Sequence, residues 1–159
     1  MRKFIYIISF FFSAQFALAQ EVPTLLFKDI LKKVENTEGL VILNVWATWC
    51  KPCVAELPHF QKVQDSLRSQ GVHIIIASAD FDTQLPNIKP FLDKRGLTLD
   101  ACHIKDGGES GWIDMFDPSF TGAIPATAFY LNGKKVLFHE GDFTEAELFK
   151  IVNEILKQK

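Results

Sequence analysis

The apolar positions of the chain follow two different repeats, and their order predicts an α/β fold. Two continuous apolar runs, "LVILNVWA" from Leu40 and "VHIIIASA" from Val72, are typical of strands buried on both faces of a parallel sheet. Between them, apolar residues recur at helical spacing from about Pro52 to Leu67. A strand, a helix and a second strand in this order predict a right-handed β-α-β unit.

The segments outside this unit carry helical and hairpin signals. Helical periodicity covers two of them, residues 24–34 and 87–95. Near the C-terminus, "ATAFYL" and "KVLFHE" flank Asn132 and Gly133, the dipeptide that most strongly indicates a β-hairpin. After the hairpin, Thr144 begins a capping-box pattern that opens a last helix. We therefore expect one α/β domain with a central mixed β-sheet flanked by helices.

The first residues have the order of a secretory signal peptide. In "MRKFIYIISFFFSAQFALA" a positive pair precedes an apolar, aromatic run that ends in an A-x-A cleavage site. An uncleaved membrane anchor is the alternative, but polar residues interrupt the run, and a spanning helix needs roughly 20 apolar residues. We therefore expect residues 1–19 to be a signal peptide, residues 20–159 to be the mature domain, and the protein to be exported to the periplasm.

Charge and cysteine content narrow the classes of function. The chain has 17 basic and 19 acidic residues, so removal of residues 1–19, which hold two basic residues, leaves 15 against 19, a net charge of −4. This balance gives no reason to expect nucleic acid as a partner. The three cysteines, Cys50, Cys53 and Cys102, are an odd number, which argues against a scaffold of paired structural disulfides. A chemical role for the cysteines explains their presence better than structural disulfides do.

The sequence "WATWCKPC" places two cysteines where the first buried strand gives way to a helix. At a helix N-terminus the dipole and the free N–H groups favour a thiolate on Cys50, and Lys51 adds a neighbouring cation. Pro52 is tolerated in a first helical turn. Cys53 lies one turn along, close enough for a disulfide. We expect Cys50 to be the nucleophile and Cys53 the resolving thiol in disulfide exchange.

"WATWCKPC" followed by "AELP", and later "GAIPATAFYLNGKKV", resembles the exported thioredoxin-fold proteins of the TlpA type, a group that includes reductants used in cytochrome c maturation. The resemblance covers about residues 24–159 and implies a thioredoxin fold with an insert, residues 83–123, between the β-α-β unit and the C-terminal hairpin. It implies a thiol:disulfide oxidoreductase that needs no cofactor or metal and acts as a monomer. Its partners would be client proteins that carry disulfides, apocytochrome c among them, and a membrane electron donor.

The resemblance also assigns residues that contact the substrate. It implies a cis peptide bond between Ile124 and Pro125 that faces the cysteines, with backbone groups free to pair with an extended client segment. Trp49, Lys51 and Pro52 would complete this contact surface around the nucleophile. Because isoleucine before the proline resembles thioredoxin, we expect the protein to be a reductant.

Glu56 lies three residues after the second cysteine and matches a glutamate that TlpA-type proteins commonly carry there. Cytosolic thioredoxins bury an aspartate six positions before the first cysteine, where this chain has Asn44, so the role of that aspartate does not carry over. Glu56 would share a helix face with Cys53 and, with a raised pKa, could take the proton of the resolving thiol. The alternative is a solvated surface glutamate.

Three other functions are compatible with the cysteine pair. A copper or zinc carrier would use both thiolates and a further ligand, which no histidine supplies convincingly. A thiol peroxidase of the related peroxiredoxin type would carry threonine and proline where this chain has Ala47 and Leu43. An interaction module would not need an intact pair of cysteines. Cys102 is expected to be a buried free thiol, with a regulatory or intermolecular disulfide as the alternatives.

Overall fold

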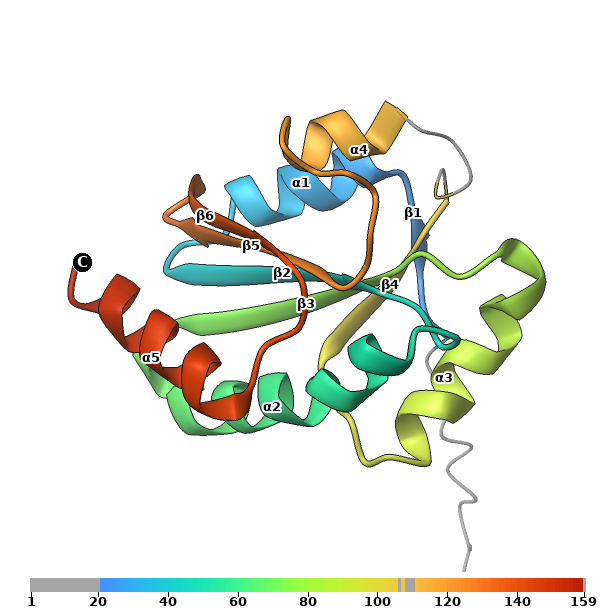
Figure 1. Ribbon diagram of the computed structural model, residues 1–159, viewed down its shortest axis with the longest axis horizontal. Helices are drawn as coiled ribbons and strands as arrows, with labels where there is room; N and C mark the ends of the chain where they lie inside the picture. Colours follow the sequence, from blue (N-terminus) through green and yellow to red (C-terminus); the bar gives the residue numbers. More distant parts are fainter. Residues whose placement is uncertain (1–20, 106, 108–110, 159) are drawn as a thin grey trace, which may run out of the picture.

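A mixed β-sheet forms the middle layer of the protein in the computed structural model, which describes residues 21–105, 107 and 111–158 (Figure 1). The strands of this part of the chain are β1 (Thr24–Leu25), β2 (Leu40–Trp46), β3 (Val72–Ser78), β4 (Asp100–Ile104), β5 (Ala126–Leu131) and β6 (Lys134–Glu140). They lie in the order β1-β4-β3-β2-β5-β6. Strands β1 to β4 pair in parallel, whereas β5 is antiparallel to both β2 and β6.

Helices cover both faces of the sheet (Figure 1). They are α1 (Phe27–Glu35), α2 (Lys51–Leu67), α3 (Leu85–Asp93), α4 (Gly111–Phe116) and α5 (Glu145–Leu156), with short 3-10 turns at Arg68–Gln70 and Asp82–Gln84. Side chains of α1 and α4 share one core with Val41, Leu43 and Val45 of β2, whereas α2, α3 and α5 share the other with the alternate positions of that strand. Every residue of β2 is therefore buried, which accounts for its unbroken apolar sequence.

The β-α-β unit and the hairpin expected from the sequence are confirmed. Strands β2 and β3 pair in parallel over their whole length, from Leu40 with Val72 onward. At the hairpin, Asn132 and Gly133 have φ angles of 50° and 77°, and the tight two-residue turn requires positive values at both positions. The expected capping box is also present, because Thr144 and Glu147 bond reciprocally at the start of α5.

The helix expected over residues 24–34 is wrong in its first turn. Thr24–Leu25 form the edge strand β1, and α1 begins only at Phe27. The N–H groups of His103 and Lys105 donate to the carbonyls of Pro23 and Leu25. The segment therefore pairs as a strand with the edge of β4 that faces away from β3. Helical periodicity does not register a partner that lies about eighty residues away along the chain.

The topology brings three loops to one edge of the sheet. The parallel strands β2 and β3 end at this edge, and the antiparallel strand β5 begins there, as the right-hand side of the sheet in Figure 1 shows. Trp46 is paired with Ser78, and Val45 with Ala126, so the segments that follow or precede these residues are neighbours. The loop with the cysteines, the loop after β3 and the loop before β5 thus meet at the candidate site.

The expected signal peptide, residues 1–19, lies outside the described residues. Within the part of the chain that the structure describes, none of the helices combines the length and apolar character needed to cross a membrane.

Candidate active site

Cys50 and Cys53 are joined by a disulfide at the start of α2, with their Cα atoms 5.3 Å apart. Cys50 is the N-cap residue, and its Sγ accepts the backbone N–H of Cys53 at 3.3 Å. After reduction, this N–H and the helix dipole would favour a thiolate on Cys50. Cys50 is 6% exposed and Cys53 is fully buried. The sulfur of Cys50 is therefore the one that a second molecule can reach, which supports its expected role as nucleophile.

The loop before β5 faces the disulfide through its backbone. The peptide bond between Ile124 and Pro125 is cis, and the carbonyl oxygen of Ile124 lies 3.6 Å from the Sγ of Cys50. Pro125 is buried, while Ile124 is half-buried and residues 121–123 are exposed. A chain that binds along the exposed side of this loop would bring its own sulfur close to Cys50.

The other residues expected to contact the substrate surround Cys50 on the outside of the molecule. Trp49, Lys51 and Pro52 are all exposed and flank Cys50 in the chain, and Ile124 contacts the Sγ of Cys50 from the opposite loop. Trp46, by contrast, is fully buried and packs against Phe91 of α3 with ring centroids 5.6 Å apart. The two tryptophans of the motif thus serve different purposes: Trp46 belongs to the core and Trp49 to the surface.

Glu56 is buried on α2, one helical turn after Cys53, with an exposed fraction of 1%, so the alternative of a solvated surface glutamate is wrong. Its Oε1 accepts the side-chain amide of Asn44 and its Oε2 accepts the N–H of Phe143, each at 2.9 Å. Burial raises the pKa of Glu56 to about 7, the two hydrogen bonds oppose that rise, and the nearby charge of Asp142 adds to it. The carboxyl group can therefore give and take a proton near neutral pH.

Sequence analysis did not predict that Asn44 bonds Glu56, or that Thr127 bonds Asn44 in turn. Asn44 of β2 donates both to Glu56 and to the hydroxyl of Thr127, 3.0 Å away on β5. Asn44 and Thr127 are direct partners in the β2–β5 pairing, and both are fully buried. The available signal was their polarity within otherwise apolar strands, because a buried polar side chain requires a partner.

A second polar group holds the loop that leads to Cys50. The carboxylate of Asp80 accepts the backbone N–H of Thr48 at 3.0 and 3.1 Å, the hydroxyl of Thr48 at 2.6 Å and the hydroxyl of Ser78 at 2.6 Å. The ring Nε2 of His103 lies 2.8 Å from the carbonyl oxygen of Asp80. Sequence analysis also missed this group, although a carboxylate two residues after the parallel strand β3 is placed at the edge where β2 ends.

Cys102 lies in the core on the opposite face of the sheet from the cysteine pair. It is a free thiol with an exposed fraction of 4%, and it packs with the side chains beneath α1 and α4. Burial raises the pKa of its thiol to about 12, and the negative charge of Asp100 acts in the same direction. The structure therefore matches the expectation of a buried free thiol.

Within the described residues, no group of three or more His, Cys, Asp and Glu side chains could hold a metal ion.

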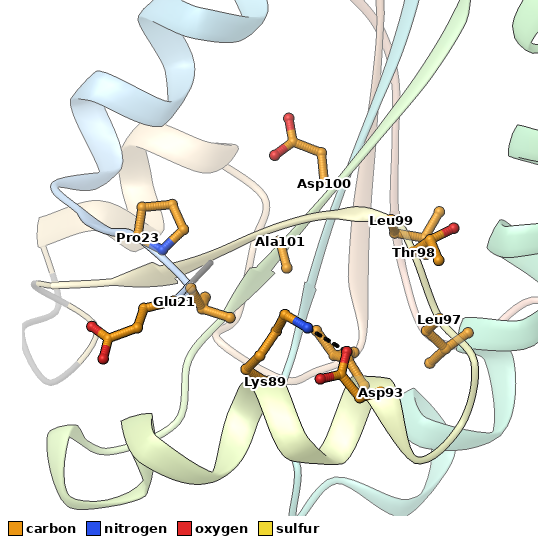
Figure 2. A pocket seen from close by; sticks show the side chains of 11 residues that line it. Glu21, Pro23, Lys89, Asp93, Leu97, Thr98, Leu99, Asp100 and Ala101 are labelled. Carbon is orange, nitrogen blue, oxygen red and sulfur yellow. Dashed lines mark hydrogen bonds and ion pairs between the residues drawn. The ribbon is translucent and has the colours of Figure 1, made fainter. Parts of the chain in front are cut away.

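A cavity of about 390 Å³ lies away from the cysteines. Figure 2 shows it between the segment that precedes β1, helix α3 and the start of β4, with Glu21, Lys89 and Asp100 around it. Lys89 pairs with Asp93 inside this space, so the charges on α3 are already matched. Neither cysteine of the pair nor Glu56 lines this cavity, which is separate from the redox chemistry.

Comparisons with known proteins agree with this geometry. The AhpC/TSA family matches residues 15–139, which include both cysteines of the pair. The thiol-disulfide oxidoreductase ResA of Oceanobacillus iheyensis is 31% identical over 153 residues, which cover 91% of this chain and 76% of that protein. ResA of Bacillus thuringiensis is 30% identical over 145 residues, covering 87% of this chain and 78% of that protein.

Solved structures show the same fold. A thioredoxin-like protein from Porphyromonas gingivalis has a TM-score of 0.59 and 31% identity, with 76% of this chain and 77% of that chain covered. A thiol:disulfide interchange protein of the thioredoxin family from Chlorobium tepidum has a TM-score of 0.64 and 22% identity, with 79% and 83% covered. The thioredoxin fold expected from the sequence is therefore confirmed.

Proposed function

Because this chain belongs to the AhpC/TSA family and is a thioredoxin-like thiol-disulfide oxidoreductase, we propose that it reduces disulfides of exported client proteins through Cys50 and Cys53. The observation that carries the proposal is the asymmetry of the pair. The Sγ of Cys50 caps α2, can be reached from outside and faces the backbone of Ile124, whereas Cys53 is fully buried. One sulfur is thus placed to attack and the other to resolve.

The reaction consists of two exchange steps. The thiolate of Cys50 attacks one sulfur of the client disulfide, so a mixed disulfide forms and the other client sulfur leaves as a thiolate. Cys53, once deprotonated, attacks the Sγ of Cys50, which closes the disulfide present in the structure and releases the second client thiolate. Two electrons pass from the protein to the client. A membrane dithiol donor must return two electrons before the next cycle.

Glu56 is the proton acceptor in the second step. It lies one helical turn after Cys53 on the same helix, is shielded from water, and has a pKa of about 7. A carboxylate with this pKa can take the proton of the buried thiol near neutral pH and return it when the client thiolate leaves. Asn44 and the N–H of Phe143 hold both oxygens of the carboxylate, so Asn44 is a positioning residue.

The client class and the location follow from the resemblance to TlpA-type proteins. We assign apocytochrome c, with its Cys-x-x-Cys-His disulfide, as a client, and cytochrome c maturation as the process that the monomer serves. Removal of residues 1–19 as a signal peptide would place the domain, residues 20–159, in the periplasm. N-terminal sequencing of protein recovered from the periplasmic fraction tests this, with Gln20 as the expected first residue.

Trapping of the mixed disulfide tests the function. The reduced Cys53→Ser variant is mixed with an oxidised Cys-x-x-Cys-His peptide, and the products are weighed by mass spectrometry. A covalent one-to-one adduct at Cys50 is expected when iodoacetamide blocks the thiol that the peptide frees, because the variant itself has no resolving thiol to release the peptide. A Cys50→Ser variant that traps the peptide equally well would reverse the assigned roles. Cys102→Ser is the matched control, since that buried thiol should leave adduct formation unchanged.

A further inference from the structure

Two exposed aromatic rings stack beside the nucleophile. Trp49 precedes Cys50 in the chain and is 55% exposed, and Phe81, in the loop after β3, is 67% exposed. Their ring centroids lie 6.5 Å apart, and the ring planes differ by 22°. The other large exposed apolar side chains of the described residues, Met115, Val136 and Leu137, lie on α4 and β6. An exposed aromatic pair at a reactive sulfur leaves apolar surface in contact with water, which is typical of an interaction site.

The backbone next to both rings is held by hydrogen bonds to Asp80. Asp80 directly precedes Phe81, and its carboxylate holds the N–H and hydroxyl of Thr48, which directly precedes Trp49. Asp80 is 3% exposed, and its carbonyl oxygen lies 2.8 Å from the ring of His103, which is fully buried. One buried residue thus fixes the backbone next to both rings. The pair is preorganised, so a ligand that covers it loses little additional conformational freedom.

We propose that Trp49 and Phe81 together form a docking plate for the residue that flanks the reacting cysteine of a client polypeptide, and that this plate selects a large aromatic or aliphatic side chain at that position. The proposal rests on the proposed function, because the client must be covalently attached to Cys50 during exchange. Phe81 thereby becomes a specificity-determining residue that the motif around the cysteines does not contain.

The geometry of the mixed disulfide identifies the occupant. In a mixed disulfide with Cys50 the client backbone would lie between the loop of Ile124, whose carbonyl oxygen is 3.6 Å from the Sγ of Cys50, and the loop of Trp49, which directly precedes Cys50. A side chain next to the client cysteine then lies over the plate, where its burial removes apolar surface of both partners from water. In glutathione, a small charged thiol, the groups that flank the cysteine are a charged γ-glutamyl group and a glycine, so it has no apolar side chain to cover the rings. The plate therefore fits a polypeptide.

Paired peptides test this selection. Two synthetic peptides with one internal Cys-x-x-Cys disulfide differ only in the residue before the first cysteine, which is phenylalanine in one and serine in the other. The second-order rate of mixed-disulfide formation is measured for each with the reduced Cys53→Ser protein. We expect the phenylalanine peptide to react about fivefold faster, as an added aromatic contact allows. Phe81→Ala should remove most of this preference, and Phe81→Trp should keep it.

Val136→Ala, which removes an exposed apolar side chain on β6, is the matched control and should keep the full preference. An equal rate for both peptides with the Cys53→Ser protein, or an undiminished preference when Phe81→Ala is added to it, would overturn the docking plate. A Cys53→Ser protein that forms no mixed disulfide with either peptide would instead contradict the proposed function on which the plate rests. The two failures are therefore distinguishable.

Discussion

The side-chain amide of Asn44 donates to the Oε1 of Glu56 across 2.9 Å in the core, between β2 and α2. The carbonyl oxygen of the same amide is buried and has no hydrogen-bond partner among the described residues. When Glu56 is ionised, its carboxylate accepts the hydrogen bond from the amide nitrogen of Asn44. When Glu56 is protonated, a flip of the Asn44 amide would present its carbonyl oxygen, which could accept the new O–H of the carboxyl group. This pair provides for both protonation states of Glu56 within a closed site.

Replacement of Glu56 by glutamine should remove the pH dependence of the resolving step near neutrality. Glutamine keeps the shape of the side chain but cannot accept the proton of Cys53. The rate at which Cys53 releases a preformed mixed disulfide is measured between pH 5 and 9. We expect an inflection near pH 7 in the parent protein and about a tenfold or greater loss of rate above it in the variant. A pH profile that is unchanged in Glu56→Gln would remove the role assigned to Glu56. Glu154→Gln, on the exposed face of α5, is the control and should keep the profile of the parent protein.

The same carboxyl group should make the oxidised protein less stable as pH rises. The pKa of Glu56 is raised from 4.5 to about 7 in the folded state, so the folded protein binds the proton more tightly than the unfolded chain. Its contribution is fully present below pH 4.5 and is lost as pH rises through about 7. The loss corresponds to about 3 kcal/mol. Urea titrations should show this decline in the parent protein relative to Glu56→Gln, and parallel curves would contradict it.

Removal of the Asn44 amide should raise the pKa of Glu56 further. The hydrogen bond from Asn44 favours the ionised carboxylate, so Asn44→Leu leaves that form less well solvated. Carbon-13 NMR of the labelled carboxyl group reads the titration directly. We expect the midpoint to move upward by about one pH unit, whereas Asn153→Leu on the exposed face of α5 should leave it unmoved. A midpoint that falls would show that Asn44 does not stabilise the carboxylate.

Asp80 should stabilise the loop that carries Trp49 and Cys50. Asp80→Asn leaves only one oxygen to accept from Thr48 and Ser78, which now donate to two carboxylate oxygens. Loss of charge-assisted, buried hydrogen bonds should lower the free energy of unfolding by about 1 to 3 kcal/mol. Guanidinium titration measures this, with the exposed Asp65→Asn as the control. A variant as stable as the parent would show that these contacts are not needed to hold the loop.

Local patterns in the sequence predicted the strands of the β-α-β unit, the hairpin at Asn132 and the position of Cys50 at a helix start. Each of these depends on residues close together in the chain, so spacing alone identified them. Three other features depend on pairings between distant segments: the strand at Thr24, the hydrogen bonds of Asn44 to Glu56 and Thr127, and the hydrogen bonds of Asp80 to Thr48. Those contacts exist only after the sheet order is set, and no local pattern contained it.

The reduction potential of the Cys50–Cys53 pair tests the central claim most directly. The protein without residues 1–19 is equilibrated in buffers of graded dithiol and disulfide ratio, and the fluorescence of Trp46 and Trp49 reports the oxidised fraction. A client reductant should have a potential near that of thioredoxin, about −270 mV. A value near −120 mV, typical of a protein that inserts disulfides, would contradict the proposed direction of electron flow.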